Sequence, residues 1–579
     1  MQADEYNNTP TFENIQNTIY TVEANCQDCY RCVRVCPVKA ISVRGGQASI
    51  EDDLCIKCGT CVRVCPQHAK TICSSLDTVK ELISSGKKVA VSVAPSFATV
   101  FNGWRSTRLP SALRRLGFHY VSETAEGAKL VTEETLKLTE KGCICTACPA
   151  VVNYIEKYRP EYVDMMIPVV SPMVAHGRLL KKRLGQDCFV VFIGPCAAKK
   201  QEALWPENID AVDAVLTFTE LIQWFEEESI ELSTCTESGF ESYGYIDQAR
   251  LFPLQGGLLK TGSIECDGTN IDVIHISGAE DVMGLLNIPA RKWRYTIVEP
   301  LFCSGGCING PGISIEKNIF LRKQDIIAYA EKASVAAAKD LDRSVNCQIK
   351  FLADEKAFVS NEVDESKISQ VLETTGKSNP ELQLNCGACG YESCRDNAIA
   401  VVRGMAEPEM CIPHMRRLAQ QRTDRIIETS PNGVVILDSE LHIINMNPAF
   451  QKMFMCNNGI IGRRISYLVD ADGYEKLACG SMEEFESIKS KYGTKYHEQI
   501  YALREECQYV GMYTNMTKIN FDAGHIDLIK KQTIEHAKEL LNHQIRFSQE
   551  MAHYLGKSTA QSEELVKRLM DLYEEQDLV

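Results

Sequence analysis

Short apolar runs alternate with stretches of helical periodicity between residues 84 and 335. The apolar runs read KKVAVSVA, CFVVFIGP and YTIVEPLF, and the helical stretches read SALRRLGF, VVNYIEKY and LIQWFEEE. Short buried strands separated by helices are typical of a mainly parallel sheet in an α/β domain. Functional sites collect at the strand ends of such domains. We therefore predict an α/β domain over residues 84–335.

The C-terminal part of the chain has a different pattern. Residues 422–519 alternate apolar and polar positions, for example around NGVVILDSELHIINMNPAF, and this alternation predicts β-strands. Residues 524–579 predict a helix with a heptad seam, and the alternative is an amphipathic helix that docks on its own domain. The apolar positions of the seam are Ile534, Leu541, Leu555 and Leu569. Residues 336–375 are polar and charged, and they predict a linker with some helix.

Composition narrows the class of protein. A chain of 579 residues exceeds the roughly 250–300 residues at which a single core stops growing, so we expect several domains. The net charge of −15 disfavours nucleic acid and anionic membranes as main partners. The N-terminus does not resemble a secretory signal, and no apolar run approaches the roughly 20 residues of a membrane span, so we expect a cytoplasmic protein. In that setting, the 26 cysteines indicate metal clusters rather than disulfides.

Two neighbouring segments repeat the pattern CxxCxxCxxxCP. They read CQDCYRCVRVCP and CIKCGTCVRVCP, within residues 15–76. In this spacing three thiolates of one loop face a 4Fe–4S cubane, and the fourth reaches the neighbouring cluster. The alternative is a pair of zinc sites, which rarely use this run. The pattern predicts a two-cluster ferredoxin domain, with one cluster on Cys26, Cys29, Cys32 and Cys65 and the other on Cys55, Cys58, Cys61 and Cys36.

Four further cysteines stand at strand-to-loop junctions of the predicted α/β domain: Cys148, Cys196, Cys303 and Cys307. Four gathered thiolates can hold a cubane, and Gly305 and Gly306 permit a close approach of the backbone to an inorganic group. Lys199 follows the second cysteine by three residues and can place an ammonium over an anionic ligand. The alternative is a set of unrelated buried cysteines.

Three segments around these cysteines resemble the signatures of the FeFe hydrogenase family. They read TACPAVVNYIEKYRPE, GPCAAKKQEA and EPLFCSGGCING, and with the ferredoxin repeat the resemblance covers about residues 15–335. It implies an H-cluster, in which a cubane on the four cysteines is bridged through Cys307 to a di-iron unit with CO and CN ligands. It also implies that Ala94, Pro95 and Ser96 contact the diatomic ligands and that Lys199 donates a hydrogen bond to a cyanide.

The chain departs from the family pattern along the proton path. Ala147 stands where the family has a cysteine that passes protons, and alanine has no group that can do so. Glu134 matches one of two relay glutamates, whereas Lys137 takes the place of the other. We therefore predict slow turnover through a different proton route. Cys145, or Cys143, returns a thiol to that route, or else both cysteines only pack in the interior. Packing around the di-iron unit also changes, at Gly194, Leu301 and Ser304.

A third cysteine constellation follows the predicted linker. The spacing CxxCx4Cx16C resembles a small 4Fe–4S domain over residues 376–420, with zinc as the alternative metal. Its candidate ligands are Cys386, Cys389, Cys394 and Cys411. Residues 421–520 resemble a PAS sensor domain. The predicted fold class is therefore multidomain, combining α/β and α+β parts.

The order of modules resembles a sensory subgroup of the hydrogenases. It predicts a regulatory enzyme that slowly and reversibly oxidises H2 to two protons and two electrons, and whose redox state biases the PAS domain and exit helix. The expected partners are H2 and protons, a redox carrier such as ferredoxin, H-cluster maturation enzymes, a downstream kinase or phosphatase, and a second copy that pairs through the PAS domain and C-terminal helix. One alternative is a metabolic hydrogenase linked to ferredoxin. The other is a non-catalytic iron–sulfur homologue that, like the eukaryotic-type assembly factors, lacks the di-iron unit.

Overall fold

The computed structural model describes most of residues 18–517. The stretches outside the description are residues 1–17, 245, 247, 266–271, 314–316, 333–339, 355–362, 481, 483, 504–506 and 518–579. The helix predicted for 524–579 and the first residues of the predicted ferredoxin domain therefore lie outside the described residues. The chain divides into two compact units, Met1–Cys411 and Ile412–Val579.

The first unit begins with a small lobe that repeats its own structure. Each cysteine motif leads into a short helix that starts after a residue in the left-handed region, Tyr30 at φ 51° and Gly59 at φ 73°. Two antiparallel strand pairs complete the lobe. The repeat in the sequence is thus a repeat in structure. Its elements are β1 (Ile19–Thr21), α1 (Arg31–Val35), β2 (Ile41–Arg44), β3 (Gln47–Ile50), α2 (Thr60–Val64) and β4 (Lys70–Ile72).

A parallel sheet in the order β6-β5-β7-β8 forms the centre of the first unit. A second parallel pair joins β9 to β10. All five residues of β5 are buried, since helices cover both faces of such a sheet. The prediction of parallel strands from the three apolar runs is confirmed. The strands are β5 (Val89–Val93), β6 (Tyr120–Glu123), β7 (Phe189–Gly194), β8 (Ala214–Thr217), β9 (Val273–Ser277) and β10 (Ile297–Leu301).

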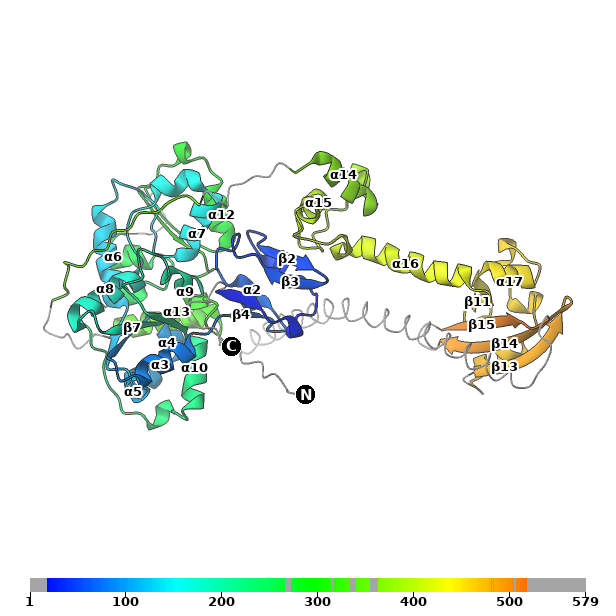
Figure 1. Cartoon of the computed structure of the whole chain (residues 1–579), viewed down its shortest axis with the longest axis horizontal. Helices are drawn as coiled ribbons and strands as arrows, with labels where there is room; N and C mark the ends of the chain where they lie inside the picture. Colours follow the sequence, from blue (N-terminus) through cyan, green and yellow to red (C-terminus); the bar gives the residue numbers. More distant parts are fainter. Residues whose placement is uncertain are drawn as a thin grey trace, which may run out of the picture. The chain divides into compact units, whose positions relative to one another are not determined.

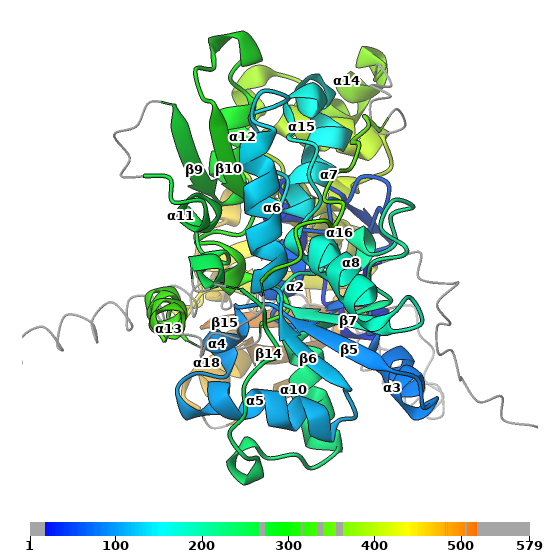
Figure 2. The same ribbon diagram turned by 90° about the vertical axis from the view of Figure 1, so that its left-hand side faces the viewer.

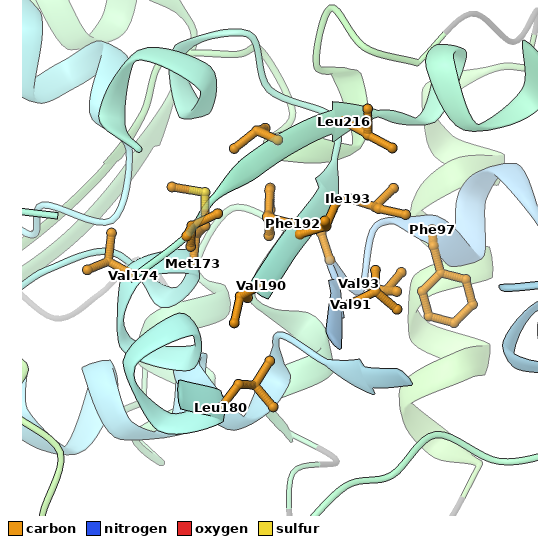
Figure 3. Close-up of a cluster of buried hydrophobic side chains, with 14 of the residues drawn as sticks. Val91, Val93, Phe97, Met173, Val174, Leu180, Val190, Phe192, Ile193 and Leu216 are labelled. Carbon is orange, nitrogen blue, oxygen red and sulfur yellow. The ribbon is translucent and has the colours of Figure 1, made fainter. Parts of the chain in front are cut away.

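Helices pack around these strands and close the main core. Figure 3 shows Val190 and Phe192 of the sheet together with Met173 and Leu180 of a neighbouring helix in this core. Figure 2 shows α6 next to α8, and these helices meet where Gly127 leaves no room for a Cβ. The helices are α3 (Leu76–Ser84), α4 (Phe97–Val100), α5 (Trp104–Arg115), α6 (Ala125–Lys137), α7 (Pro149–Tyr158), α8 (Pro172–Leu184), α9 (Ala198–Glu202), α10 (Phe218–Glu227), α11 (Gly257–Thr261), α12 (Ala279–Leu286) and α13 (Ile319–Glu331).

The first unit ends in a second small lobe built on α14 (Glu365–Thr374) and α15 (Cys394–Val402). The helices share a small apolar core in which Ile368 and Leu372 contact Cys394. Helix α14 lies within the segment predicted as a linker with some helix, and it packs on the predicted cluster domain. Residues 364–411 are called the C-terminal lobe below.

The second unit starts with α16 (Ile412–Thr429) and continues into one antiparallel sheet in the order β12-β11-β15-β14-β13. Figure 1 shows β11, β13, β14 and β15 side by side, and α17 packs against β11. Aromatic rings of Phe450, Phe454 and Tyr513 fill its core. The predicted strands in residues 422–519 are confirmed. They are β11 (Gly433–Leu437), β12 (Ile443–Met446), β13 (Glu484–Lys491), β14 (Thr494–Leu503) and β15 (Gln508–Asn515), with α17 (Pro448–Met453) and α18 (Asp472–Ala478).

None of the helices in the described part of the chain has both the length and the apolar composition that a bilayer crossing requires.

Candidate metal centres

The four cysteines predicted for the central site converge on one place in the first unit. Cys148 precedes α7, Cys196 follows β7, and Cys303 and Cys307 follow β10. Repulsion between the thiolate forms links Cys303 and Cys307 to each other and to both other cysteines. Burial is the main reason why the pKa of Cys196 rises to about 12 and why the pKa of Cys303 and of Cys307 is far above the usual range.

The loop between the last two cysteines is held by close backbone packing. Gly305 and Gly306 have φ of 77° and 97°. A Cβ on Gly306 would lie 2.3 Å from the carbonyl oxygen of Pro253, and one on Gly305 would lie 2.4 Å from the Cδ1 of Ile319. The neighbours that require these glycines are therefore protein atoms, and their approach to an inorganic group stays a prediction.

Lys199 places a donor group beside the thiols, and Ser96 carries a buried hydroxyl. The Lys199 ammonium bonds Glu202 at 2.7 Å and the carbonyl oxygen of Ala147 at 3.3 Å, and its charge lowers the pKa of Cys196 and of Cys307 against the larger effect of burial. Ser96 is 1% exposed, and its hydroxyl has no hydrogen-bond partner among the described residues.

The segment that holds Ser96 lies beside the segment that holds the second cysteine. Ala94 donates its N–H to the carbonyl oxygen of Ile193 at 2.9 Å, which joins the carboxyl end of β5 to that of β7. Pro95 continues from this junction into α4. A buried hydroxyl without a partner is uncommon. The Ser96 hydroxyl, the four thiols and the Lys199 ammonium fit a group that contains a metal with affinity for thiolates and that also carries hydrogen-bond acceptors.

The predicted proton-path residues lie in contrasting places. Glu134 is in the last turn of α6, where it bonds Lys137 at 3.2 Å and Gln348 at 3.0 Å near the surface. Cys145 is 2% exposed, and burial raises its pKa well above the usual range. Cys143 is half-buried. The structure therefore keeps Cys145, and not Glu134, inside the interior that holds the thiols.

Glu299 is an interior acid that sequence reasoning missed. It is 3% exposed, and its carboxylate accepts N–H groups of Leu258 at 3.1 Å and Leu259 at 3.3 Å. Burial raises its pKa to about 7, and its negative charge acts on the thiols of Cys145 and Cys307. The available signal was an acidic residue inside the apolar run YTIVEPLF.

The cysteines of the ferredoxin repeat pair across the two motifs. Cys61 interacts with Cys36, Cys55 and Cys58, which is the predicted crossed set. Cys36 and Cys65 occupy equivalent places, since each sulfur accepts the N–H of the residue four positions later at 3.3 Å. Among the other set, Cys32 interacts with Cys26 and Cys29. The contribution of Cys65 to that set stays a prediction.

The ferredoxin lobe adjoins the central site through α7. Lys157 donates to the carbonyl oxygens of Asp53 at 2.8 Å and Cys55 at 3.1 Å. The thiol of Cys58 interacts with Cys148 and Cys303. The crossed cysteine set is therefore the neighbour of the central site.

The third constellation gathers around a buried lysine. Cys389 interacts with Cys386 and Cys411. Lys377 is 5% exposed and hydrogen-bonds the thiols of Cys394 and Cys411. In the described part of the chain, no three His, Cys, Asp or Glu side chains are placed to share one metal ion. A cubane makes no such demand, because it presents several iron atoms to its thiolates.

Four family models match separate parts of the chain. Residues 18–80 match a 4Fe–4S dicluster domain, and residues 87–311 match the C-terminal domain of the iron-only hydrogenase large subunit. Residues 383–413 match an Fe–S cluster family, and residues 421–489 match a PAS domain. The chain is thus an iron–sulfur protein with a hydrogenase-type domain and a PAS domain.

The relatives fall into two groups. A cytosolic Fe–S cluster assembly factor NAR1 of Vanderwaltozyma polyspora is 36% identical over 20% of this chain and 22% of its own length. Iron hydrogenase 1 of Clostridium pasteurianum is 24% identical over 41% of this chain and 52% of its own length. NAR1 of Kluyveromyces lactis is 26% identical over 34% of this chain and 56% of its own length. The chain therefore spans between about a fifth and just over half of these relatives.

Solved structures of an FeFe hydrogenase from Chlamydomonas reinhardtii are also similar. One is 19% identical, covers 48% of this chain and 99% of its own, and has a TM-score of 0.38. The PAS domain of an HTR-like protein from Haloarcula marismortui is 17% identical, covers 17% of this chain and 98% of its own, and has a TM-score of 0.15.

Proposed function

We propose that this chain is a regulatory FeFe hydrogenase that oxidises H2 slowly and reversibly and passes the electrons to its own iron–sulfur sites. The observation that carries this proposal is a series of neighbouring side chains. It runs from Cys307 through Cys303 and Cys58 to Cys36, and then through the ring of Tyr391 to Cys389. Cys389 in turn interacts with Cys411, which directly precedes α16 in the sequence. A redox change at that position has a direct covalent route toward the PAS domain.

The central residues have distinct roles in this proposal. Cys148, Cys196, Cys303 and Cys307 would hold an H-cluster, and that group would supply the heterolytic splitting of H2. Lys199, oriented by Glu202, donates a charge-assisted hydrogen bond to an anionic acceptor such as cyanide. In the segment 94–96, Ser96 supplies a second donor, while Ala94 and Pro95 shape an apolar wall that excludes water.

Slow turnover follows from the proton route. Ala147 cannot carry a proton, and a positioned acid or base commonly contributes 10²- to 10⁴-fold to a rate. Cys145 and Glu299 are the titratable groups that we assign to the interior part of the route, because the charge of Glu299 acts on both Cys145 and Cys307. Glu134 is assigned to the surface end. Cysteine and carboxyl groups can each hold a proton and release it.

The electron route uses the ferredoxin lobe first. Electrons leave the central site toward the crossed set beside Cys58, and the C-terminal lobe takes them toward α16. We assign 4Fe–4S clusters to both sets of the ferredoxin lobe and to the set that ends at Cys411. The protein is proposed to act in the cytoplasm, to receive its H-cluster from maturation enzymes, to pair with a second copy through the PAS domain and C-terminal helix, and to signal to a kinase or phosphatase.

A second candidate function is supported by the NAR1 relatives, which are named as assembly factors. Under this alternative the chain carries cubanes but no di-iron unit. A third candidate, a metabolic hydrogenase that exchanges electrons with ferredoxin, is supported by the match to iron hydrogenase 1.

Infrared spectroscopy with an H2 titration separates the three. After in-vitro maturation, the proposal expects CO and CN bands that respond to H2 and a low rate of H2 oxidation. A Cys307→Ser variant is the matched control, because it removes one of the four thiolates that would hold the H-cluster. Absence of the bands would favour the assembly-factor alternative, and fast turnover would favour the metabolic one.

A further inference from the structure

The C-terminal lobe packs directly on the ferredoxin lobe at the first cysteine motif. The Lys39 ammonium donates to the carbonyl oxygen of Gly390 at 2.8 Å. Arg34 joins both lobes, because it donates to the carbonyl oxygens of Ala388 at 3.1 Å and Cys29 at 2.9 Å. The loop that carries two candidate ligands of the third site thus touches the loop that carries ligands of the ferredoxin sites.

A second set of contacts fixes the orientation of the lobe. The backbone N–H of Val43 donates to the carbonyl oxygen of Met405 at 3.0 Å. The Glu407 carboxylate accepts the N–H groups of Gly45 and Gly46, the latter at 3.2 Å. Between these polar contacts lies a shared apolar core of Ile19, Val33, Ile41, Val43, Ala48, Tyr391, Ala400, Ala406 and Met410. Burial and directed hydrogen bonds together define one docked arrangement.

Tyr391 belongs to the shared apolar core of this contact. It is 6% exposed, and its hydroxyl has no hydrogen-bond partner among the residues that the structure describes. Burial raises its pKa to about 12, and the thiols of Cys389 and Cys36 add to this effect. The ring packs in the same apolar cluster as Cys389, a ligand position of the third site, and Cys36, one of the crossed ferredoxin set.

Gly390 makes this approach possible. Its φ is 95°, and a Cβ there would lie 2.9 Å from the Cγ1 of Val33 and 3.2 Å from the backbone nitrogen of Arg34. Both neighbours belong to α1, so the loop cannot come as close to that helix with any larger residue.

We propose that the C-terminal lobe is a built-in electron acceptor, which receives single electrons from the ferredoxin lobe across the Gly390–Tyr391 contact. In each transfer, one reduced ferredoxin cluster is oxidised by one electron and the third cluster is reduced by one. The inference rests on the proposed function only for H2 as the source of the electrons. The buried ammonium of Lys377 favours the additional negative charge on the acceptor. A soluble carrier has no access to this face of the ferredoxin lobe, because the chain's own lobe covers it.

Freeze-quench EPR on the full-length protein tests this transfer without H2. The clusters are reconstituted with iron and sulfide, and a limiting amount of dithionite is mixed in under argon. A Cys389→Ser variant, which loses a ligand of the third site, identifies the signal of that site. In the wild-type chain, the signal of the third site is expected to rise in a fast phase as the ferredoxin signal falls.

Two glycine variants form a matched pair. Gly390→Ala inserts a Cβ into the contact and is expected to lose the fast phase. Gly404→Ala has the same kind of left-handed strain, at φ 70°, but its Cβ meets no atom within 4 Å, so the fast phase is expected to remain. Equal kinetics in both variants would overturn the proposal.

A measurement on the unmodified chain guards against a variant that misfolds. With all clusters reduced, the proposal expects magnetic coupling between the third cluster and the ferredoxin clusters, seen as EPR line broadening that Cys389→Ser removes. Its absence would also overturn the proposal. Because no di-iron unit takes part, a chain that failed to oxidise H2 could still pass both measurements.

Discussion

Glu299 is expected to hold a proton near neutral pH, and replacing it with glutamine tests this directly. The side chain is fully enclosed, and its two carboxylate oxygens accept backbone N–H groups from the start of α11. Glutamine keeps the shape of the side chain and one acceptor oxygen, but it cannot ionise. The substitution therefore separates the charge of Glu299 from its packing.

The size of the effect follows from the raised pKa. Burial moves the pKa of Glu299 from 4.5 to about 7, which corresponds to roughly 3 kcal/mol. The unfolded carboxyl ionises near pH 4.5 and the folded one near pH 7, so the folded state binds more protons between these values. Stability contributed by this group is therefore full below pH 4.5, falls as the pH rises, and is lost above pH 7. In Glu299→Gln that pH-dependent loss disappears.

Infrared difference spectroscopy across pH 4 to 9 measures the protonation itself. In the wild-type chain, the carboxylic acid band of Glu299 is expected to disappear as the pH rises, with a midpoint near pH 7. Glu156 has a pKa that burial also raises to about 7, but its carboxylate lies on α7 and accepts the N–H of Leu352. Each glutamine variant should remove one of two overlapping bands, and only Glu299→Gln should alter the pH profile of turnover.

Thermal unfolding of Glu299→Gln and of the wild-type chain at pH 5 and 8 measures the same protonation through stability. The melting temperature of Glu299→Gln should fall less than that of the wild type between these two pH values. If the infrared band of Glu299 titrated near its ordinary value of 4.5, or if the two chains lost stability equally, the assignment of Glu299 as an interior proton carrier would be refuted.

Variants at three further positions test the assigned roles. Ala147→Cys returns a thiol beside the first ligand and should raise H2 turnover by up to about 10²- to 10⁴-fold with unchanged CO and CN bands; an unchanged rate would contradict the proton-limited view. Cys145→Ala should lower turnover while the same bands persist, and equal turnover would assign this thiol to packing alone. Lys377→Met should lower the reduction potential of the third cluster in an EPR redox titration, whereas Lys377→Arg should largely retain it. An unchanged reduction potential in Lys377→Met would show that the charge of Lys377 does not stabilise the reduced third cluster.

The sequence allowed the ligand loops to be predicted because their chemistry is local. In a run such as CxxCxxCxxxCP the spacing of the ligands can be read directly, and the composition of a run such as CFVVFIGP predicts a buried strand. Cys196 follows β7 for that reason, and the parallel strands bring it to the same edge as residues 94–96. Local pattern and sheet topology together predict the convergence.

The residues that sequence reasoning missed depend on contacts between distant segments. Glu299 is held by amides about forty residues earlier in the chain, at Leu258 and Leu259, so no local pattern marks its role. Lys377 stands in a polar stretch with few apolar residues, among them Ile368 and Leu372, which lie one helical turn apart on α14. Such a short signal predicts some helix but not the cluster that it covers.

The proposed slow turnover and the proposed built-in acceptor are physically compatible. An enzyme built for flux needs an open electron exit, whereas the exit here is proposed to be closed by residues 364–411. The signal of a one-electron acceptor is the fraction of molecules in which it is reduced. Turnover therefore needs only to be faster than the changes in H2 concentration. To move α16 from 1:99 to 99:1 between two states, reduction must favour one by about 10⁴-fold, or roughly 5.5 kcal/mol. For a one-electron couple this equals a potential difference of about 240 mV between the two states, at 59 mV per tenfold change. A buried site such as that of Lys377 is where one charge has effects of this size, because the surroundings screen it weakly.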